Sequence, residues 1–323
     1  MNMTPVTIAQ ACERLLAQDD ILIITHRRPD GDTLGSGGAL CRLLQHKGKR
    51  AFLHPNEDAT PRLAPLMEGL TPPEGFSPRM LVAVDTASEE LFPASAEPFR
   101  GRVDLCVDHH PSNTGYARET LVEPQAAATG EVIWKMAVHM GVKPDLDMCR
   151  ALYIAVSTDT GCFRFSNTTP LAHRIAADCM EAGLDAHAVN QVFFERKTKT
   201  RFRVERQLFD TLRFYRGGKL VCGCLERDFT DSIGASGDDL DNLSTLLMHL
   251  EGVECAVFLQ ELKQRGEYKV SLRTNKPLDA SAICSAFGGG GHPRAAGCTM
   301  RGSIDECREK LVAEASRHMD AQC

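Results

Sequence analysis

The pattern of apolar and polar positions changes near residue 185. Before that point, short apolar runs with the composition of strands (ILIIT, AFLHP, MLVAVD and VDLCVD) alternate with helical stretches. Such alternation is typical of a mostly parallel sheet flanked by helices. We therefore predict an α/β domain over residues 1–185. It begins with an amphipathic helix in which Thr4 is the cap and Pro5 lies in the first turn.

The remaining sequence predicts a helical linker and a smaller α/β domain. Residues 186–212 show helical spacing of apolar positions without Pro or Gly, so we expect one continuous helix. Within residues 213–323, FYRGGKLVCGCLE predicts a hairpin that turns at Gly217 and Gly218. DDLDNLSTLLMHLEG predicts a helix ended by Gly252, and VECAVFLQEL and EYKVSLRT predict two further strands.

Composition places the chain among ordinary globular proteins. Its 323 residues are 43% apolar, enough for two hydrophobic cores. No apolar run reaches the roughly 18 residues of a membrane span, and the N-terminus lacks the order of a signal peptide, so we expect a cytoplasmic protein. The 13 cysteines include no CxxC pair, which suits a reducing compartment, and Cys222 and Cys224 are expected to be buried thiols.

The charge balance limits the partners of the protein. A formal net charge of −6 argues against a protein that coats long nucleic acid, but it permits short anionic substrates. The segment RKTKTRFRVER, residues 196–206, is a local basic exception. Its simplest interpretation is a solvated helix face between the two domains.

The first candidate chemistry lies in THRRPDGDTLGS, residues 25–36. This segment places His26, Asp30 and Asp32 in a glycine-flanked turn directly after an apolar run. Taken alone, it fits either a strand-to-helix connection with Asp32 as the helix cap, or a site for a cation between the two carboxylates.

Three other segments supply the same kinds of side chain. MLVAVD ends in Asp85, VDLCVDHH ends in Asp108, His109 and His110, and Asp159 follows an apolar run in YIAVSTDTG. Ligands of open α/β sheets bind beyond the carboxyl ends of the strands, so these side chains are expected to converge. Their number suits two divalent ions roughly 3.5 to 4 Å apart that share a carboxylate. The candidate ligands are His26, Asp30, Asp32, Asp85, His109 and Asp159.

Five motifs in order, HRRPDGDTLGS, VD, VDHH, STDTG and GGGGHPRAAG, resemble those of the DHH phosphoesterase superfamily with its DHH-associated C-terminal domain. Within it, the chain is most similar to the stand-alone bacterial type that combines oligoribonuclease activity with phosphatase activity on 3′-phosphoadenosine 5′-phosphate. The resemblance implies that Asp108 orients a ligand histidine and that His110 faces the scissile phosphate. It implies one manganese ion on His26, Asp30 and Asp85, and another on Asp32, Asp85, His109 and Asp159.

The substrate contacts are expected mainly in the second domain, with the active site in the cleft between the domains. Four consecutive glycines would weaken a helix or strand, so we expect them to let the backbone approach a ligand phosphate. The resemblance supports a substrate contact for Arg273, and Arg164 is a further candidate. The expected substrate-binding residues are Arg164, Arg273, Gly289, Gly290, Gly291 and His292.

These expectations describe a manganese-dependent phosphoesterase that cleaves short oligoribonucleotides and linear dinucleotides to mononucleotides, and 3′-phosphoadenosine 5′-phosphate to AMP. Two Mn²⁺ ions, replaceable by Mg²⁺ or Co²⁺, would generate a bridging hydroxide that attacks phosphorus. The alternatives are a soluble phosphodiesterase for cyclic di-AMP or linear dinucleotides and a non-catalytic nucleotide sensor. The expected partner is short RNA or a dinucleotide, with no membrane and no long duplex. The sequence leaves open a homodimer, the preferred substrate, the polarity of degradation, and whether His110 donates a proton or only contacts the transition state.

Overall fold

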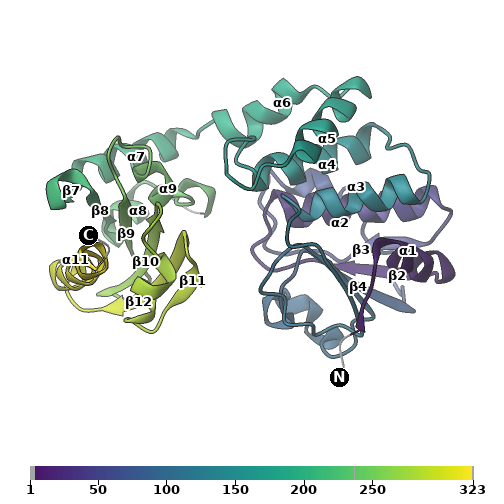
Figure 1. Ribbon diagram of the computed structural model, residues 1–323, viewed down its shortest axis with the longest axis horizontal. Coiled ribbons are helices and arrows are strands. Elements are labelled where there is room, and N and C mark those ends of the chain that lie inside the picture. The colour runs from purple at the N-terminus through teal and green to yellow at the C-terminus, as the bar shows by residue number, and fades with distance from the viewer. Residues whose placement is uncertain (1–3, 236, 322–323) are drawn as a thin grey trace. The chain divides into compact units, whose positions relative to one another are not determined.

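The computed structural model describes residues 4–235 and 237–321. The chain divides into two compact units, Met1–Arg196 and Lys197–Cys323, each built around its own sheet (Figure 1). Among the described residues, no helix combines the length and apolar character needed to cross a membrane.

The first unit contains a six-stranded sheet in which every pairing is parallel. The spatial order is β1-β6-β5-β4-β2-β3. From β2 the chain runs out to β3 and then returns to β4 on the other side of β2, so the switch point of the topology lies between β2 and β4. The strands are β1 (Thr4–Pro5), β2 (Ile21–Ile24), β3 (Ala51–Leu53), β4 (Met80–Val84), β5 (Leu105–Asp108) and β6 (Glu119–Val122).

The two faces of this sheet are covered differently. One face packs against helices whose apolar residues form the larger core, and the helices α2 to α5 lie together on this side in Figure 1. The other face is covered by short 3₁₀ turns that bury Phe92 and Ala96. The α/β prediction is therefore confirmed for this unit. Its main helices are α1 (Ile8–Ala17), α2 (Gly31–His46), α3 (Thr129–His139), α4 (Leu146–Asp159) and α5 (Pro170–Glu181).

The start of the first helix differs from the prediction. Thr4 and Pro5 lie in β1, which pairs with β6, and the helix begins at Ile8. Its cap is Thr7, whose hydroxyl accepts a hydrogen bond from the backbone N–H of Gln10 at 3.3 Å while the Gln10 side chain accepts from the Thr7 N–H at 2.9 Å. This reciprocal capping box fixes the boundary, so the prediction of Thr4 as the cap is wrong.

The predicted continuous helix over residues 186–212 is interrupted. It consists of α6 (Ala186–Asn190), a π-helical turn (Gln191–Glu195) and α7 (Lys199–Asp210). Arg196 is extended, and the Thr198 side chain accepts from the N–H of Arg201 at 2.8 Å to cap α7. A threonine cap therefore starts a new helix without any Pro or Gly.

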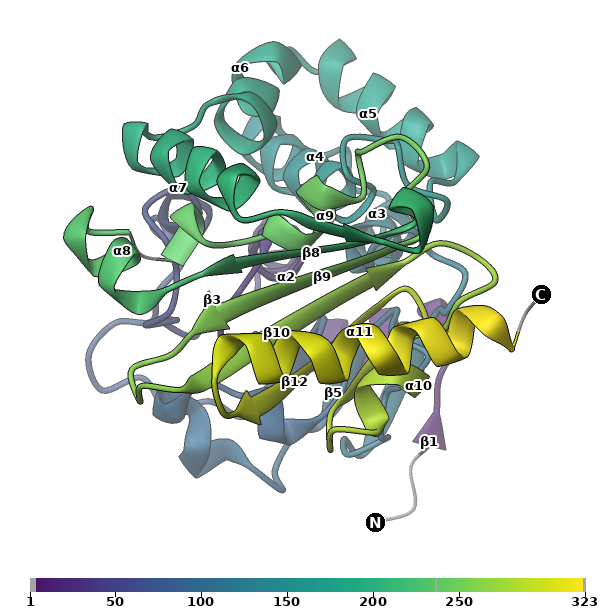
Figure 2. The same cartoon turned by 90° about the vertical axis from the view of Figure 1, so that its left-hand side faces the viewer.

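The second unit contains a mixed six-stranded sheet in the order β11-β12-β10-β9-β8-β7. Figure 2 shows its strands β8, β9 and β10 side by side. The predicted hairpin and the two predicted strands are confirmed, and only β8 and β9 pair in parallel within this sheet of described residues. The strands are β7 (Arg213–Tyr215), β8 (Leu220–Leu225), β9 (Cys255–Glu261), β10 (Glu267–Thr274), β11 (Gly290–His292) and β12 (Ala295–Arg301).

The predicted helix ending at Gly252 is much shorter than expected. A 3₁₀ turn (Gly237–Asp239) precedes α9 (Leu243–Leu247), and the two are separated because Asn242 before α9 adopts a left-handed conformation with φ of 55°. Besides α7 and α9, this unit contains the helices α8 (Arg227–Ser232), α10 (Ala280–Ser285) and α11 (Ile304–Asp320).

Alternating residues along the strands of the second sheet belong to two different hydrophobic cores. One contains buried residues of α10 and α11, and the other contains buried residues of α7 and α9. Cys222 belongs to the first core and Val221 to the second, so these pairs of helices cover opposite faces of the sheet. Cys224 is buried as well, which confirms the expectation for the two thiols of β8.

Candidate active site

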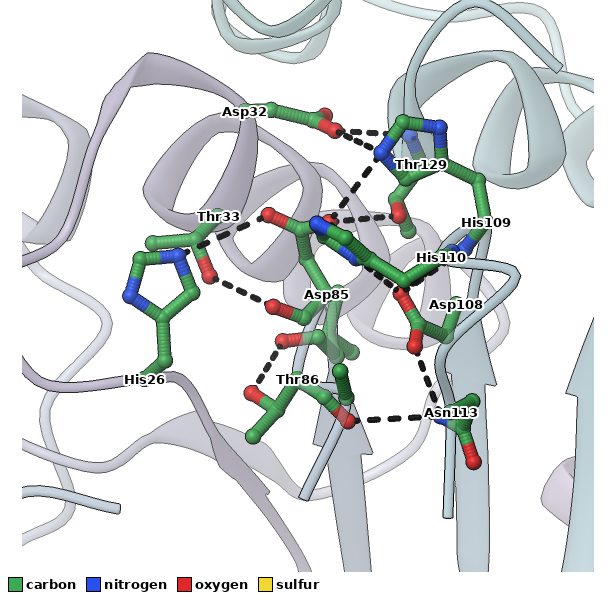
Figure 3. A network of polar contacts seen from close by, with 12 residues as sticks. His26, Asp32, Thr33, Asp85, Thr86, Asp108, His109, His110, Asn113 and Thr129 are labelled. Atoms are coloured by element: carbon green, nitrogen blue, oxygen red, sulfur yellow. Dashed lines mark hydrogen bonds and ion pairs between the residues drawn. The ribbon is translucent and has the colours of Figure 1, made fainter. Parts of the chain in front are cut away.

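The predicted chemistry of the first unit gathers at the switch point of its sheet. His26 follows β2, Asp85 follows β4, and His109 and His110 follow β5. These three strands are neighbours, so their carboxyl ends bring the side chains together (Figure 3). The position agrees with the general location of ligand sites in open α/β sheets.

Asp30 and Asp32, the two carboxylates of the segment THRRPDGDTLGS, have different structural roles. Asp30 is the N-cap of α2, where one of its oxygens accepts from the N–H of Thr33 at 2.9 Å. Asp32 lies in the first turn of that helix and is only 1% exposed. The interpretation of Asp32 as the helix cap is therefore wrong, and its burial needs another explanation.

The N-terminus of α3 holds Asp32 in place. The backbone N–H groups of Thr129 and Gly130 donate to its two oxygens at 2.7 and 3.0 Å, and the Ser36 hydroxyl donates at 2.7 Å. A helix N-terminus stabilises a negative charge. Sequence reasoning missed Thr129 and Gly130, although a Thr-Gly pair that begins a helix is a usable signal for such a contact.

Asp85 lies at the centre of the cluster. It is 2% exposed and has a left-handed backbone with φ of 54°, a conformation that few non-glycine residues adopt. Its Oδ1 accepts from the Thr129 hydroxyl at 2.8 Å and lies 3.8 Å from His109 Nε2. Its Oδ2 lies 3.8 Å from His26 Nε2. The two oxygens of one carboxylate thus face two different histidines.

Both histidines present the same nitrogen to the cluster. His26 Nδ1 is 2.8 Å from the carbonyl oxygen of Arg27, and His109 Nδ1 is 3.1 Å from that of Ala126. A carbonyl only accepts, so each Nδ1 carries the proton and each Nε2 keeps its lone pair for the centre of the site. This arrangement is the usual one for histidines that bind metal.

Asp159 reaches the cluster because α2 and α4 pack closely. A Cβ added to Gly35 of α2 would lie 2.5 Å from the carbonyl oxygen of Ala151 in α4, so the two helices approach in a way that only glycine allows. Asp159 ends α4, and its Oδ2 is 3.5 Å from His109 Nε2.

The assembled side chains fit divalent cations. The side chains form three groups, and within each group the ligand atoms lie within 4.8 Å of one another. Each group combines carboxylate and imidazole donors. Two ligands on one ion, each about 2.1 Å from it, stand about 3 to 4 Å apart, the spacing seen between these side chains. The groups are His26, Asp30 and Asp85; Asp32, His109 and Asp159; and Asp85, His109 and His110.

Electrostatics point to the same conclusion. Burial, together with the neighbouring Asp30, raises the pKa of Asp85 to about 7. Burial and the neighbouring Asp32 raise the pKa of Asp159 to about 7, and the pKa of Asp32 is raised by burial and by Asp85. Several buried carboxylates that repel one another are costly unless a cation lies among them.

Asp108 holds the ring of His110, and it also accepts from the backbone N–H of His109. The Asp108 carboxylate is fully buried and accepts from His110 Nδ1 at 2.8 Å and from the Asn113 amide at 2.6 Å. These hydrogen bonds outweigh burial and hold the pKa of Asp108 below its usual value. Burial alone would lower the pKa of His110, but the hydrogen bond to Asp108 and the charge of Asp85 raise it to about 9. Asn113 carried no signal in the sequence.

In the second unit, three adjacent strands bring together two of the predicted substrate contacts. Ala295 of β12 lies opposite Arg273 of β10 on one side and opposite His292 of β11 on the other. Residues opposite one another share a face of the sheet. Arg273 is half-buried, burial lowers its pKa, and no carboxylate in the described part of the chain pairs with it. Its Nη1 donates to the carbonyl oxygen of Leu272 at 3.3 Å, so the positive charge has a neutral partner within the chain.

The glycine run does not have the structure that we expected. Gly290 and Gly291 belong to β11, and the run is explained in part by its packing on β12. A Cβ on Gly289 would lie 2.2 Å from the carbonyl oxygen of Gly297, and one on Gly291 would lie 2.6 Å from that of Ala295. Gly290 has open space around it. Of the three glycines, it is therefore the one at which a ligand could approach the backbone as we expected.

Arg164 is not among the side chains that form the cluster. It is exposed, and its Nε donates to the carbonyl oxygen of Gly161 at 2.6 Å. The structure therefore gives it a local role in the turn that follows α4.

Comparison with known proteins identifies the class. Residues 20–156 match the DHH family N-terminal domain, and residues 218–320 match the DHHA1 domain. The chain belongs to the DHH family and is a phosphoesterase, as the motifs predicted.

The relatives extend along almost the whole chain. A protein from Thermus thermophilus described as a bifunctional oligoribonuclease and PAP phosphatase NrnA is 34% identical over 90% of this chain and 88% of its own length. A Bacillus subtilis protein with the same description is 22% identical over 92% and 93%. A cyclic-di-AMP phosphodiesterase PdeA from Listeria monocytogenes is 24% identical over 97% of this chain and 48% of its own.

Solved structures agree on the fold. An exopolyphosphatase-related protein from Bacteroides fragilis superposes with a TM-score of 0.86 at 18% identity, over 96% of both chains. RecJ from Thermus thermophilus, in complex with Mn²⁺, has a TM-score of 0.54 at 14% identity over 96% of this chain and 54% of that one.

Proposed function

We propose that this protein hydrolyses short oligoribonucleotides and linear dinucleotides to mononucleotides, and 3′-phosphoadenosine 5′-phosphate to AMP. The observation that carries the proposal is the carboxylate of Asp85, whose two oxygens face His26 and His109. The descriptions of the Thermus and Bacillus relatives support the choice of substrates.

The proposed cofactor is a pair of divalent cations, with manganese as our choice of ion. Ligation by oxygen and imidazole without thiolate suits manganese, and magnesium or cobalt could replace it. When bound, two such ions lower the pKa of water towards 7 and neutralise charge at the phosphoryl group. One set of ligands would be His26, Asp30 and Asp85, and the other Asp32, Asp85, His109 and Asp159.

Residues of the chain supply the remaining chemistry. Asp85 would belong to both ligand sets, while the N-terminus of α3 fixes the carboxylate of Asp32. The hydrogen bond from Nδ1 to Asp108 orients His110, which leaves His110 Nε2 to donate a proton to the leaving oxygen or to a phosphoryl oxygen. Arg273, His292 and the open backbone at Gly290 would hold a second phosphate of the substrate.

A second candidate is a phosphodiesterase that acts on cyclic di-AMP or its linear product. The Listeria relative favours this alternative. Both functions use the same site chemistry, so they differ only in the preferred substrate.

A comparison of initial rates tests the proposal. Purified protein with Mn²⁺ is incubated separately with a ribodinucleotide, a ribopentanucleotide, 3′-phosphoadenosine 5′-phosphate and cyclic di-AMP. We expect the two oligoribonucleotides to be cleaved fastest. A clear preference for cyclic di-AMP would replace the proposal with the second candidate, and binding of all four without cleavage would indicate a sensor.

His292→Ala and Arg273→Ala test whether the second unit holds substrate. Removing one charge-assisted hydrogen bond, worth about 1.5 to 3 kcal/mol, should weaken dinucleotide hydrolysis roughly ten- to a hundredfold. The loss can appear in kcat as well as KM, because binding of a distant phosphate positions the reacting one. Bis-p-nitrophenyl phosphate lacks that second phosphate, so its hydrolysis should fall much less. Equal losses on both substrates would instead place these residues at the reacting phosphate.

A further inference from the structure

The helix α7 has a basic sequence, and its inner face accounts for part of that charge. Val204 and Leu208 are fully buried in the core beneath the helix. The nearby carboxylate of Glu205 accepts from Lys197 Nζ at 2.9 Å and from Arg201 Nε at 2.8 Å. Two of the basic residues are therefore explained by the fold of this unit.

The outer face of α7 is not explained in this way. Phe202 is 62% exposed and Phe209 is 45% exposed, and neither belongs to a core. Three cations lie beside them, and within the described residues none forms an ion pair with a carboxylate: Lys199, Arg203 and Arg206. Spacings of three, four and seven residues put all five side chains on one stripe of the helix. This outer face consists of Lys199, Phe202, Arg203, Arg206 and Phe209, with the exposed carboxylate of Asp210 at its C-terminal end.

The neighbouring strand continues the same surface. Phe214 of β7 is 55% exposed and pairs with Val221 of β8, which belongs to the core under α7. Opposite residues share a face, so Phe214 lies on the side of the sheet that α7 covers. Arg213 pairs with Cys222 of the other core, so it lies on the opposite face and is not part of this surface. Figure 2 shows α7 leading directly into this edge strand.

We propose that this outer face of α7, together with Phe214, binds single-stranded oligonucleotide through base stacking and phosphate contacts. Exposed aromatic rings offer stacking platforms, and cations without internal partners offer sites for phosphates. Stacking and phosphate contacts do not read base edges, so binding is tolerant of sequence. The inference deepens the proposed function, on which it rests: the surface recruits substrates longer than a dinucleotide.

Charge argues against a second copy of this chain as the occupant. A symmetric contact between two copies would bring together two faces of net positive charge, because each has three cations and only the carboxylate of Asp210. The anionic backbone of an oligonucleotide complements the same charges, although the whole chain has a net charge of −6.

The test is equilibrium binding of a fluorescein-labelled single-stranded RNA hexamer to the full chain in excess chelator, read by anisotropy. Phe202→Ala with Phe209→Ala should weaken binding at least tenfold, because the variant has no rings there on which bases can stack. Arg203→Ala with Arg206→Ala should make the dependence of log K on log salt shallower by about 1.4, about 0.7 for each phosphate that the variant no longer neutralises. A DNA hexamer should behave alike, since nothing on the face selects the 2′-hydroxyl.

A matched control removes two exposed lysines elsewhere in the same unit. Lys263→Ala with Lys310→Ala removes the same amount of charge and should leave binding within twofold of the wild type. Melting temperatures of all variants should match, because the replaced side chains are exposed.

Hydrolysis separates this inference from the proposed function. With Mn²⁺, the phenylalanine variant should cleave a dinucleotide within twofold of the wild-type rate but show a raised KM for a hexamer. If the wild type cleaves no RNA but the variants lose hexamer binding, the proposed function is wrong and the inference about this binding surface is supported. Wild-type hexamer binding by both double variants would overturn the inference. The inference would also be overturned if the variants bound the hexamer unchanged but lost a dimer that the wild type forms in size-exclusion chromatography. That result would assign the face to a second copy.

Discussion

Asp85→Ala should lower the rate of dinucleotide hydrolysis at least a hundredfold at saturating Mn²⁺. The substitution removes the carboxylate whose oxygens lie 3.8 Å from both His26 Nε2 and His109 Nε2. The remaining carboxylates would then repel one another without the group that joins the two ligand sets. The measurement is kcat on a ribodinucleotide. Nearly normal turnover would mean that another residue joins the two sets.

Asp85→Asn separates lost chemistry from lost structure. The amide keeps the shape of the side chain and an oxygen that accepts from the Thr129 hydroxyl. Activity should fall as it does in the alanine variant. In chelator the asparagine variant should melt at the wild-type temperature or above, because one of several repelling carboxylates is gone. A clearly lower melting temperature would contradict this account of the charges.

The positions of the central side chains could be predicted because each follows an apolar run. In a parallel sheet such runs are buried strands, and all their carboxyl ends meet at one edge. His26, Asp85 and His109 thus needed no knowledge of distant contacts. Asp159 is similar, since it ends an apolar helix.

The residues that support the cluster could not be found in this way. Asn113 and Thr129 act through single hydrogen bonds to Asp108 and Asp85, and residues of these types are common in loops and at helix starts. Only the folded chain shows which of them face a carboxylate. The same holds for the histidine ring that Asp108 contacts, which is that of His110.

The predictions of the helix boundaries and of the role of the glycine run were wrong for a related reason. Thr7 and Thr198 cap helices through local side-chain bonds that compete with other threonines nearby, so the pattern alone placed one cap wrongly and missed the other. Gly289 and Gly291 are required by the close approach of β12, a contact that apolar periodicity does not encode.

We propose that catalysis depends on cations held by the cluster around Asp85. The most direct measurement follows ribodinucleotide hydrolysis after the protein is treated with excess chelator, and again after Mn²⁺ is returned. The account predicts that chelation abolishes hydrolysis and that Mn²⁺ restores it, because the buried, mutually repelling carboxylates need a cationic counter-charge. Hydrolysis that persists at the same rate in excess chelator would contradict the account.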